Sequence, residues 1–506
     1  CIQCNRCAYV CPHAVIRPVA LTEEEVAQAP EGLKTLDMIG MPGMKFTMTV
    51  SAYDCTGCGS CVNVCPGKKN KETGEVEKAL TMANMEANAG EQTFFDFGRE
   101  IPVKPEVVAK FKETTVKGSQ FKQPLLEFSG ACAGCGETPY AKLITQLFGD
   151  RMYIANATGC SSIWGNSSPS TPYTVTPEGK GPAWSNSLFE DNAEFGYGML
   201  LAQNTIRDRL KAKVEKIAEK TTDEAVKAAA AEYLETYTVG ATNGTATDKL
   251  VAALEALDCD CEERAEVLKN KDFLAKKSQW IFGGDGWAYD IGYGGVDHVL
   301  ASKKDINIMV FDTEVYSNTG GQSSKATKTG ATAQFAAGGK ETKKKDLASM
   351  AMSYGYVYVA QIAMGGDFNQ TVKAIAEAEA YPGPSLIIAY APCINHGIKK
   401  GMSKAQTEEQ LAVECGYWNN FRYNPAAEGD KFSLDSKAPK AEGYQDFLNG
   451  EVRYNALKRA NPAKADKLFA LNEQEAMERY DYLNKLVTVY AAEKEEIGRA
   501  SCRERV

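Results

Sequence analysis

Eight of the sixteen cysteines in this 506-residue chain fall into two runs with the same spacing. The pattern Cys-x2-Cys-x2-Cys-x3-Cys-Pro begins at Cys1 and recurs at Cys55. Three thiolates at such intervals can bind three irons of one cubane, while the fourth, held by the turn at proline, reaches the other cluster. The spacing therefore predicts two [4Fe-4S] clusters with crossed ligand sets, which are Cys1, Cys4, Cys7 and Cys65, and Cys55, Cys58, Cys61 and Cys11.

A zinc site and a disulfide framework are the alternative interpretations of these eight cysteines. Zinc motifs rarely combine consecutive two-residue steps with Cys-Pro. Disulfides need a secreted, oxidising setting, of which the sequence shows no sign. The doubled motif therefore favours iron–sulfur clusters.

The remaining cysteines are sparser. Cys132 and Cys135 form one pair, Cys160 stands in Thr-Gly-Cys-Ser, and Cys393 follows Ala-Pro. Local spacing does not join these four, so ordinary buried cysteines, a zinc site and a third cluster all remain open. Structural or incidental roles are expected for the others, which are Cys259, Cys261 and Cys415.

A second kind of chemistry is indicated by a Gly-Asp-Gly turn at residues 284–286, directly after an apolar strand expected at 279–283. Another apolar strand, expected at 305–311, ends at Asp312-Thr313-Glu314-Val315. One βα crossover would bring both strand ends to the same edge of a parallel sheet. Mg²⁺ prefers carboxylate, neutral and carbonyl oxygens together with diphosphate oxygens. Asp285, Thr313 and the Val315 carbonyl are therefore its predicted protein ligands.

This pair of strand ends is typical of a thiamine-diphosphate site, with the helix N-terminus beyond Gly286 favouring the anion. Thr313 replaces the usual asparagine but keeps an oxygen ligand. A Gly-Asp-Gly sequence alone is more often a simple tight turn. A nucleotide site would instead need a P-loop or Gly-x-Gly-x-x-Gly motif in suitable context, and neither is present.

The strands and helices expected around these residues indicate an α/β fold. We expect a thiamine-diphosphate-binding domain with a mostly parallel sheet flanked by helices, preceded by a small α+β bacterial-type 2[4Fe-4S] ferredoxin domain. The boundaries are residues 1–100 for the ferredoxin domain, 101–124 for a linker, 125–420 for the thiamine domain and 421–495 for a helical extension that could be a dimer arm. A helical insertion is expected at about 202–277, interrupted at Gly240–Gly244.

Composition excludes several classes of protein. The net charge is −9, and 24% of residues are charged against 44% hydrophobic, which argues against disorder and gives no reason to expect nucleic-acid binding. No apolar run is long enough to cross a bilayer. Segment 324–345 is basic; it is either a solvated loop or a contact for anionic coenzyme A or an acidic electron carrier.

Taken in order, the two cysteine runs, Cys-x2-Cys-Gly-Glu, Thr-Gly-Cys-Ser, Gly-Asp-Gly and Ala-Pro-Cys resemble the carboxyl-terminal part of the pyruvate:ferredoxin (flavodoxin) oxidoreductase family. The resemblance implies that Cys132, Cys135, Cys160 and Cys393 hold a third cluster beside the thiamine. It also implies catalytic roles for Glu137 and Asn318, the latter facing the substrate. Implied cofactor contacts are Glu137, Cys160, Gly284, Asp285, Gly286, Trp287, Thr313, Glu314, Val315, Tyr316, Ser317 and Asn318.

The activity implied by this resemblance is oxidative decarboxylation of pyruvate to acetyl-CoA and CO₂, with single electrons passing through three [4Fe-4S] clusters to ferredoxin or flavodoxin. Thiamine diphosphate, Mg²⁺ and coenzyme A are implied too. The same reaction on another 2-oxo acid, and a non-catalytic electron carrier, are the alternatives. In this family upstream domains supply further catalytic residues, so we expect the chain alone to be inactive.

The resemblance also implies a homodimer in an anaerobic cytoplasm. Some relatives carry a structural calcium, for which Asp305 and Asn307 are candidates, although ordinary strand-edge polar residues are the simpler interpretation. Because Cys1 lies within a motif, we expect a fragment of a longer protein. Residues 496–506, with Cys502, resemble a translated sequencing adapter and are expected to be a non-native tail without a role.

Overall fold

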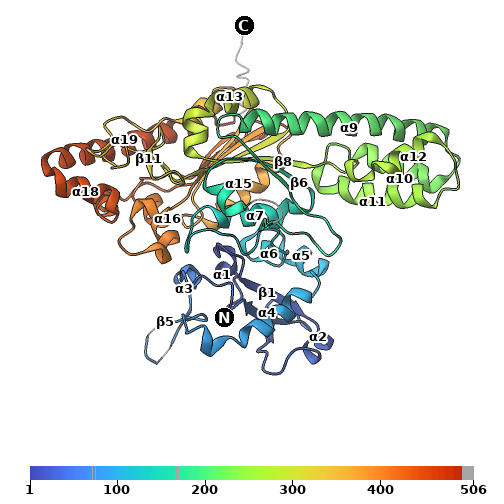
Figure 1. The fold of residues 1–506 in the computed structure, drawn as a ribbon, viewed down its shortest axis with the longest axis horizontal. Helices are drawn as coiled ribbons and strands as arrows, with labels where there is room; N and C mark the ends of the chain where they lie inside the picture. Colours follow the sequence, from blue (N-terminus) through green and yellow to red (C-terminus); the bar gives the residue numbers. More distant parts are fainter. Residues whose placement is uncertain (71, 75, 167–169, 493–506) are drawn as a thin grey trace, which may run out of the picture.

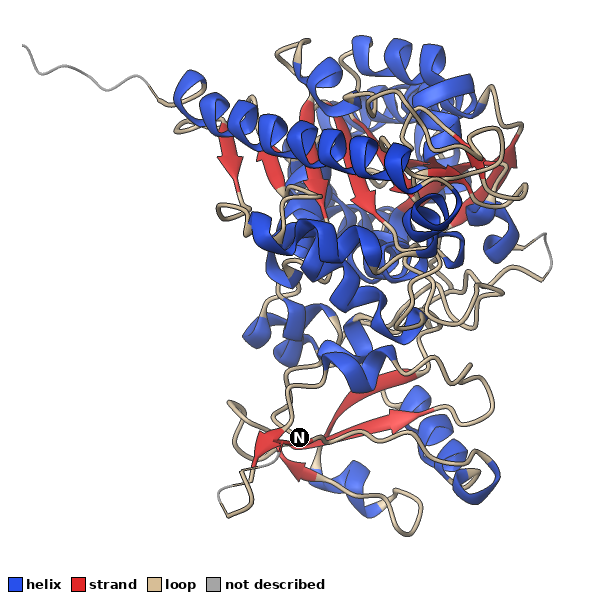
Figure 2. Ribbon diagram, turned by 90° about the vertical axis from the view of Figure 1, so that its left-hand side faces the viewer, coloured by secondary structure: helices blue, strands red, loops and turns tan. Residues whose placement is uncertain are grey.

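The computed structural model describes residues 1–70, 72–74, 76–166 and 170–492, and an eight-stranded sheet forms its centre (Figures 1 and 2). The strand order is β15-β14-β12-β13-β9-β8-β6-β7. Strands β6 to β13 in this sheet are parallel, and β14 and β15 join antiparallel at one edge. The predicted mostly parallel sheet is thus confirmed. The strands are β6 (Met152–Ala157), β7 (Ala183–Ser187), β8 (Ser278–Gly284), β9 (Ile306–Asp312), β12 (Tyr358–Ile362), β13 (Pro384–Tyr390), β14 (Phe421–Tyr423) and β15 (Phe432–Leu434).

Helices cover both faces of the sheet. The central strands are therefore apolar along their whole length and not only at alternate positions. On β9, Ile308 and Val310 belong to one hydrophobic core and Met309 and Phe311 to the other. The first core includes residues of α9 (Asn192–Lys220), α13 (Tyr293–Ala301) and α14 (Leu347–Met352). The second includes residues of α7 (Thr138–Phe148), α8 (Cys160–Gly165) and α15 (Phe368–Ala380).

The expected helical insertion forms an arm that projects to one side of the sheet (Figure 1). It comprises the outer part of α9 with α10 (Glu224–Glu235), α11 (Gly240–Ala256) and α12 (Glu262–Lys269), and it has a hydrophobic core of its own. The helices are interrupted just before the expected residues 240–244, between the end of α10 at Glu235 and the start of α11 at Gly240, and α11 runs through 240–244. A Cβ on Gly240, the first residue of α11, would lie 3.0 Å from the Arg151 guanidinium, so glycine permits this close approach.

The amino-terminal module lies below the main sheet in Figure 1 and contains a three-stranded antiparallel sheet in the order β1-β3-β2. Two short helices, α1 and α3, each begin inside one of the cysteine runs and contact each other. Its elements are α1 (Arg6–Tyr9), β1 (Ile16–Leu21), α2 (Glu23–Ala27), β2 (Leu36–Asp37), β3 (Lys45–Val50), α3 (Ser60–Val64), β4 (Lys68–Lys69), β5 (Val76–Glu77) and α4 (Glu91–Glu100).

Two helices lie in the segment expected to be a linker, α5 (Pro105–Phe111) and α6 (Val116–Ser119). Proline at the first position of α5 is favourable because its missing N–H has no helical partner there. The Thr115 hydroxyl caps α6 by accepting a hydrogen bond from the Gly118 N–H at 3.0 Å. The connection is therefore folded, and α6 contacts both α1 and α7.

The carboxyl-terminal region expected to be helical begins instead with β14 and β15, which extend the main sheet. It continues as α17 (Tyr444–Asn449), α18 (Val452–Ala460) and α19 (Pro462–Val489), preceded by α16 (Ala405–Glu414). Residues 496–506 lie outside the described residues. Within the described ranges, no helix combines the length and the apolar character needed to cross a bilayer.

Candidate functional site

The ends of β8 and β9 bring three oxygen atoms together, as predicted from their order in the sequence. The two strands pair in parallel, with Gly284 opposite Phe311. The Thr313 hydroxyl lies 3.0 Å from Asp285 Oδ1 and also 3.0 Å from the Val315 carbonyl oxygen. A carboxylate, a hydroxyl and a backbone carbonyl thus converge at one point, and these are donors of the hard type that Mg²⁺ prefers.

The Asp285 carboxyl is completely buried and accepts a 2.5 Å hydrogen bond from the Ser324 hydroxyl. Burial raises its pKa well above the usual value, and the negative charge of Asp312 raises it further. A carboxylate in these surroundings needs a compensating cation, because an unpaired buried charge is costly. The surroundings of Asp285 therefore fit a divalent metal ion.

A buried ion network stands directly behind these oxygens. Lys344 pairs with Asp312 at 2.7 Å and with Glu314 at 3.1 Å, and Arg453 pairs with Glu314 at 2.9 Å. Tyr417 also donates a 2.5 Å hydrogen bond to Glu314. Burial opposes ionisation of Glu314, but the charges of Lys344 and Arg453 outweigh it and hold its pKa below the usual value. The Glu314 side chain is therefore occupied by these partners and anchors the loop.

The backbone around the Gly-Asp-Gly turn is shaped by close contacts. A Cβ on Gly286 would lie 2.6 Å from the Tyr316 ring, whereas one on Gly284 would meet nothing nearer than 3.9 Å. The turn leads into a π-helix, Gly286–Ile291, in which Trp287 is completely buried. The Trp287 ring is therefore part of the hydrophobic core behind the turn.

The loop after β9 carries the remaining predicted cofactor contacts. Val315–Tyr316 (β10) pairs with Gln322–Ser323 (β11) in a short hairpin, and the turn between them holds Ser317 and the exposed Asn318. The Ser317 hydroxyl lies 3.1 Å from the Cys160 sulfur. This contact joins the thiamine-type loop to one of the sparse cysteines, which lie far apart in the sequence.

The four sparse cysteines gather at the same edge of the sheet. Cys132 and Cys135 lie in the loop before α7, Cys160 begins α8, and Cys393 follows β13. The Gly136 N–H donates a 3.1 Å hydrogen bond to the Pro392 carbonyl, which holds the first and last of these segments together. Burial raises the pKa of Cys393 to about 11, and the charge of Cys132 adds to this effect.

Glu137 lies among these thiols at the start of α7. Its carboxylate accepts a 2.7 Å hydrogen bond from the Trp164 indole, and burial raises its pKa to about 7. Burial also raises the pKa of Cys135 and of Cys160, and in both cases the nearby Glu137 charge contributes. The predicted catalytic Glu137 thus adjoins the thiols.

The two cysteine runs of the amino-terminal module come together through α1 and α3. Burial raises the pKa of Cys61 to about 12, and the charges of Cys11, Cys58 and Cys55 act in the same direction. These are the other three members of its predicted ligand set. Burial likewise raises the pKa of Cys7 to about 12, with contributions from Cys4, Cys61 and Cys65. The crossed arrangement of the two sets is therefore compatible with the geometry.

Among the residues that the structure describes, no three His, Cys, Asp or Glu side chains lie close enough together to hold one metal ion. A cubane does not require such a cage, because each thiolate binds a different iron. At the sheet edge, two of the three predicted oxygen donors come from a hydroxyl and a backbone carbonyl. The types of donor therefore fit iron–sulfur clusters and Mg²⁺.

Comparison with known protein families agrees with this geometry. Residues 1–69 match the family described as "4Fe-4S dicluster domain", and residues 267–389 match "Thiamine pyrophosphate enzyme, C-terminal TPP binding domain". Pyruvate:ferredoxin oxidoreductase of Moorella thermoacetica is 56% identical over 497 residues, which cover 96% of this chain and 41% of that protein. Pyruvate-flavodoxin oxidoreductase of Enterobacter agglomerans is 53% identical with the same coverage.

The chain is homologous to the pyruvate:ferredoxin and pyruvate-flavodoxin oxidoreductases. It spans about two fifths of the length of these relatives and corresponds to their carboxyl-terminal part. "Pyruvate dehydrogenase [NADP(+)], mitochondrial" of Euglena gracilis is also 48% identical over 474 residues, covering 92% of this chain and 26% of that protein. A solved 2-oxoglutarate:ferredoxin oxidoreductase from Magnetococcus marinus gives a TM-score of 0.30 at 16% identity, covering 53% of this chain and 65% of that one, too low to support an argument.

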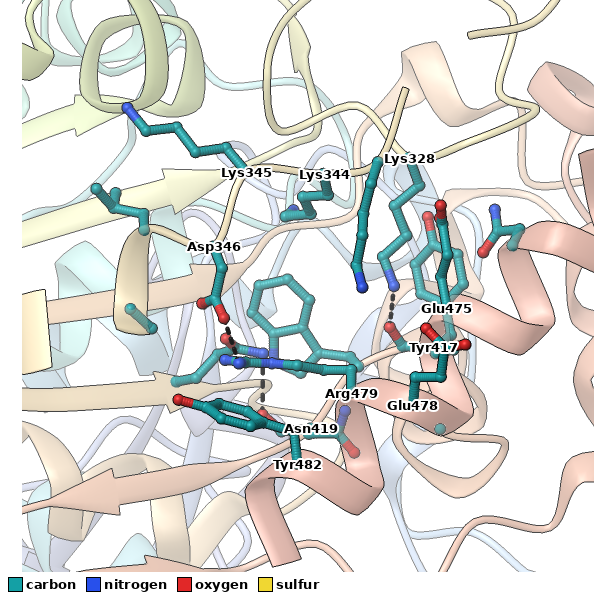
Figure 3. Close-up of a pocket in the computed structure, with 18 of the residues that line it drawn as sticks. Lys328, Lys344, Lys345, Asp346, Tyr417, Asn419, Glu475, Glu478, Arg479 and Tyr482 are labelled. Carbon is teal, nitrogen blue, oxygen red and sulfur yellow. Dashed lines mark hydrogen bonds and ion pairs between the residues drawn. The ribbon is translucent and has the colours of Figure 1, made fainter. Parts of the chain in front are cut away.

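The basic segment at residues 324–345 contributes lysines to a cavity near the candidate site. Lys328, Lys344 and Lys345 of the basic segment line a cavity of about 480 Å³ together with Tyr417 and residues of α19 (Figure 3). Lys344 is engaged by carboxylates, and Lys328 donates to the Tyr417 carbonyl. The interpretation of this segment as a solvated loop is therefore wrong for Lys328 and Lys344, whose ammonium groups bind partners within the protein.

Sequence reasoning missed the ion network, because Lys344, Arg453 and Tyr417 belong to no motif of the oxidoreductase pattern. The basic segment was the only signal that pointed towards it.

Asp305, a candidate for calcium, pairs with Lys276 at 2.9 Å, which agrees with an ordinary strand-edge role. Cys415 is buried, and Cys259 and Cys261 lie between α11 and α12 in the arm.

Proposed function

We propose that this chain is the cluster-bearing and thiamine-bearing part of an enzyme that oxidises pyruvate to acetyl-CoA and CO₂ and passes electrons to ferredoxin or flavodoxin. The single observation that carries the proposal is the 3.1 Å contact between Cys160 and Ser317. It places a predicted cluster ligand beside the loop that follows the predicted Mg²⁺ ligands. An enzyme that couples decarboxylation to one-electron transfer needs this juxtaposition.

In this proposal Asp285, Thr313 and Val315 hold Mg²⁺, while Cys132, Cys135, Cys160 and Cys393 hold the third [4Fe-4S] cluster. When bound, thiamine diphosphate supplies the carbon nucleophile and the clusters supply one-electron acceptors. The chain's own residues position these groups: Ser317 approaches the thiol, Trp164 orients Glu137, and Asn318 remains exposed for a substrate. Upstream domains would complete the site, and a homodimer in an anaerobic cytoplasm belongs to the same proposal.

Pyruvate is favoured over other 2-oxo acids because the relatives with the highest identity carry pyruvate in their names. The NADP⁺-named relative shows that similar chains occur in proteins with another named acceptor. Ferredoxin or flavodoxin as the carrier therefore stays part of the proposal. A non-catalytic electron carrier would have no use for the buried oxygen site at Asp285.

The test is the iron and acid-labile sulfide content after anaerobic reconstitution. Three cubanes require about twelve of each per chain and two require about eight. Cys160→Ser should lower the content from the higher to the lower value, while Cys261→Ser, in the arm, should leave it unchanged. A wild-type content of about eight, unaffected by Cys160→Ser, would contradict the third cluster and with it the proposed coupling.

A further inference from the structure

Lys142 occupies an unusual position between the thiamine domain and the amino-terminal module. It lies on α7, and its side chain is only 2% exposed. Its ammonium group donates hydrogen bonds to the Tyr9 carbonyl at 3.0 Å, to the Gln120 side-chain oxygen at 3.5 Å and to the Ala8 carbonyl. Lys142 therefore reaches from one part of the molecule into the first cysteine run of the other.

This buried ammonium group has no carboxylate partner within ion-pairing distance anywhere in the described ranges. Arg17, whose positive charge also acts on Lys142, is already paired with Glu127. Burial lowers the pKa of Lys142 to about 8, and the negative charge of Cys11 acts against that decrease. A buried cation without an opposite charge beside it is costly. Its presence therefore points to a negatively charged group that the carboxylate side chains do not supply.

The groups whose negative charge, when they are ionised, would act on Lys142 are Cys11 and Cys7. The Ala8 carbonyl, which accepts from Lys142, also accepts the Cys11 N–H at 3.2 Å. Ala8 directly follows Cys7 in the sequence. The ammonium group therefore adjoins the last two cysteines of the first run, and the crossed ligand sets assign these two to different clusters.

We propose that Lys142 is the buried counter-charge of the clusters in the amino-terminal module and raises the reduction potential of the cluster bound by Cys11 with Cys55, Cys58 and Cys61. This inference rests on the proposed function. Reduction adds a negative charge to a cluster, and a fixed positive charge nearby stabilises the reduced form. We assign the effect to the cluster bound by Cys11 and not to the one bound by Cys7, because the Cys11 N–H and Lys142 both donate to the Ala8 carbonyl.

The test replaces Lys142 in the reconstituted chain and follows each cluster by an EPR-monitored redox titration. Lys142→Gln keeps a hydrogen-bond donor but removes the charge, Lys142→Met removes both, and Lys142→Arg keeps the charge. We expect the two neutral variants to lower the equilibrium constant for reduction of one cluster about tenfold, which is about 59 mV for one electron. Lys142→Arg should stay close to the wild type.

Lys122→Met is the matched control, because this lysine pairs with Glu113 and contacts the end of α7 without touching the cysteine run. Unchanged potentials in both neutral variants, with iron content retained, would overturn the proposal. So would a loss of iron that Lys142→Arg shares with the neutral variants, since packing and not charge would then explain the role of Lys142. A wild-type chain that binds no clusters would instead contradict the proposed function itself.

Discussion

At the scale of single residues, the molecule keeps two carboxylates buried directly beside the predicted Mg²⁺ ligands. Asp312 ends β9, and Glu314 follows with a left-handed backbone, φ 60°. A non-glycine residue in this region is strained and persists only where its surroundings fix it. Here Lys344 and Arg453 fix it by ion pairs. The turn that presents Thr313 and Val315 is thus held in place by charges from distant parts of the chain.

Replacing Lys344 by methionine should therefore destabilise the fold. The change leaves Asp312 and Glu314 buried without this cation, and removing one partner of a buried pair costs about 3–5 kcal/mol. Lys343→Met is the control, since this neighbouring residue is exposed. Urea denaturation at pH 7 measures both, and the control should change the free energy of unfolding by less than about 0.5 kcal/mol. Equal effects of the two substitutions would contradict this account.

Glu409 on α16 gives a pH-dependent prediction. Burial raises its pKa to about 8, despite hydrogen bonds from the Gly365 N–H at 2.7 Å and the Tyr140 hydroxyl at 3.1 Å. In the unfolded chain the carboxyl ionises near its ordinary value, so the folded state binds more protons between these two pKa values. Stability should therefore fall as pH rises from about 4.5 to about 8.

Glu409→Gln should flatten this part of the pH profile of unfolding. The new amide keeps an acceptor for Gly365, and the Gln406 oxygen, which has no partner in the structure, can accept from its NH₂ group. Glu414→Gln, on the exposed side of the same helix, is the control and should leave the profile as it is. A profile that Glu409→Gln does not alter would show that Glu409 ionises normally in the folded protein.

At the scale of elements, the junction of β8 with the π-helix depends on close packing around Trp287. A Cβ on Gly283 would lie 2.3 Å from the indole, whereas a Cβ on Gly284 would meet nothing nearer than the Phe311 carbonyl oxygen at 3.9 Å. Gly283→Ala should therefore overpack the core, at a cost of about 1–3 kcal/mol. Gly284→Ala should leave the fold unchanged. Thermal unfolding together with Trp fluorescence measures both, and equal unfolding temperatures would refute the packing argument.

The sequence patterns predicted elements well where a signal was local and continuous. The apolar runs around Gln279 and Ile308 became β8 and β9, because strands covered on both faces are apolar throughout. The strands β14 and β15 were missed, since three-residue strands depend on the edge of an existing sheet for their pairing. Glycines at 240–244 suggested a break, but the helix there is stabilised by its tertiary contacts.

The residues of the candidate site were likewise predictable only where their signal in the sequence was local. Regular spacing alone predicted the eight cysteines of the amino-terminal module, and two strand ends predicted the meeting of Asp285 with Thr313. Cys160 and Cys393 required the family resemblance, because the sheet brings them together across more than two hundred residues. No sequence pattern could reveal the pairing of Lys344 with Asp312, which depends on how a long loop folds back over the sheet.

At the scale of the whole molecule, the arm has a hydrophobic core separate from both faces of the sheet. Leu250 is fully buried in the arm. Replacing it should therefore leave the candidate site at the ends of β8 and β9 folded. Leu250→Ala should cost about 2–5 kcal/mol locally. Hydrogen exchange should become faster in α10, α11 and α12 and remain unchanged in β8 and β9.

Leu143→Ala is the contrasting variant, because Leu143 belongs to a core that β8 and β9 share. It should accelerate hydrogen exchange in the sheet itself. If Leu250→Ala also accelerated exchange in β8 and β9, the arm and the sheet would unfold as one unit. The helical insertion would then be a structural support of the site and not an independent appendage.

The gathering of Cys132, Cys135, Cys160 and Cys393 at one sheet edge also has a consequence for biosynthesis. These thiols come from the loop before α7, from α8 and from the chain after β13, so they meet only after long-range strand pairing is complete. The ribosome releases Cys393 long after Cys132. Iron delivery to this centre must therefore follow translation and folding, and occupancy of the proposed third cluster would report that a newly made chain has been assembled correctly.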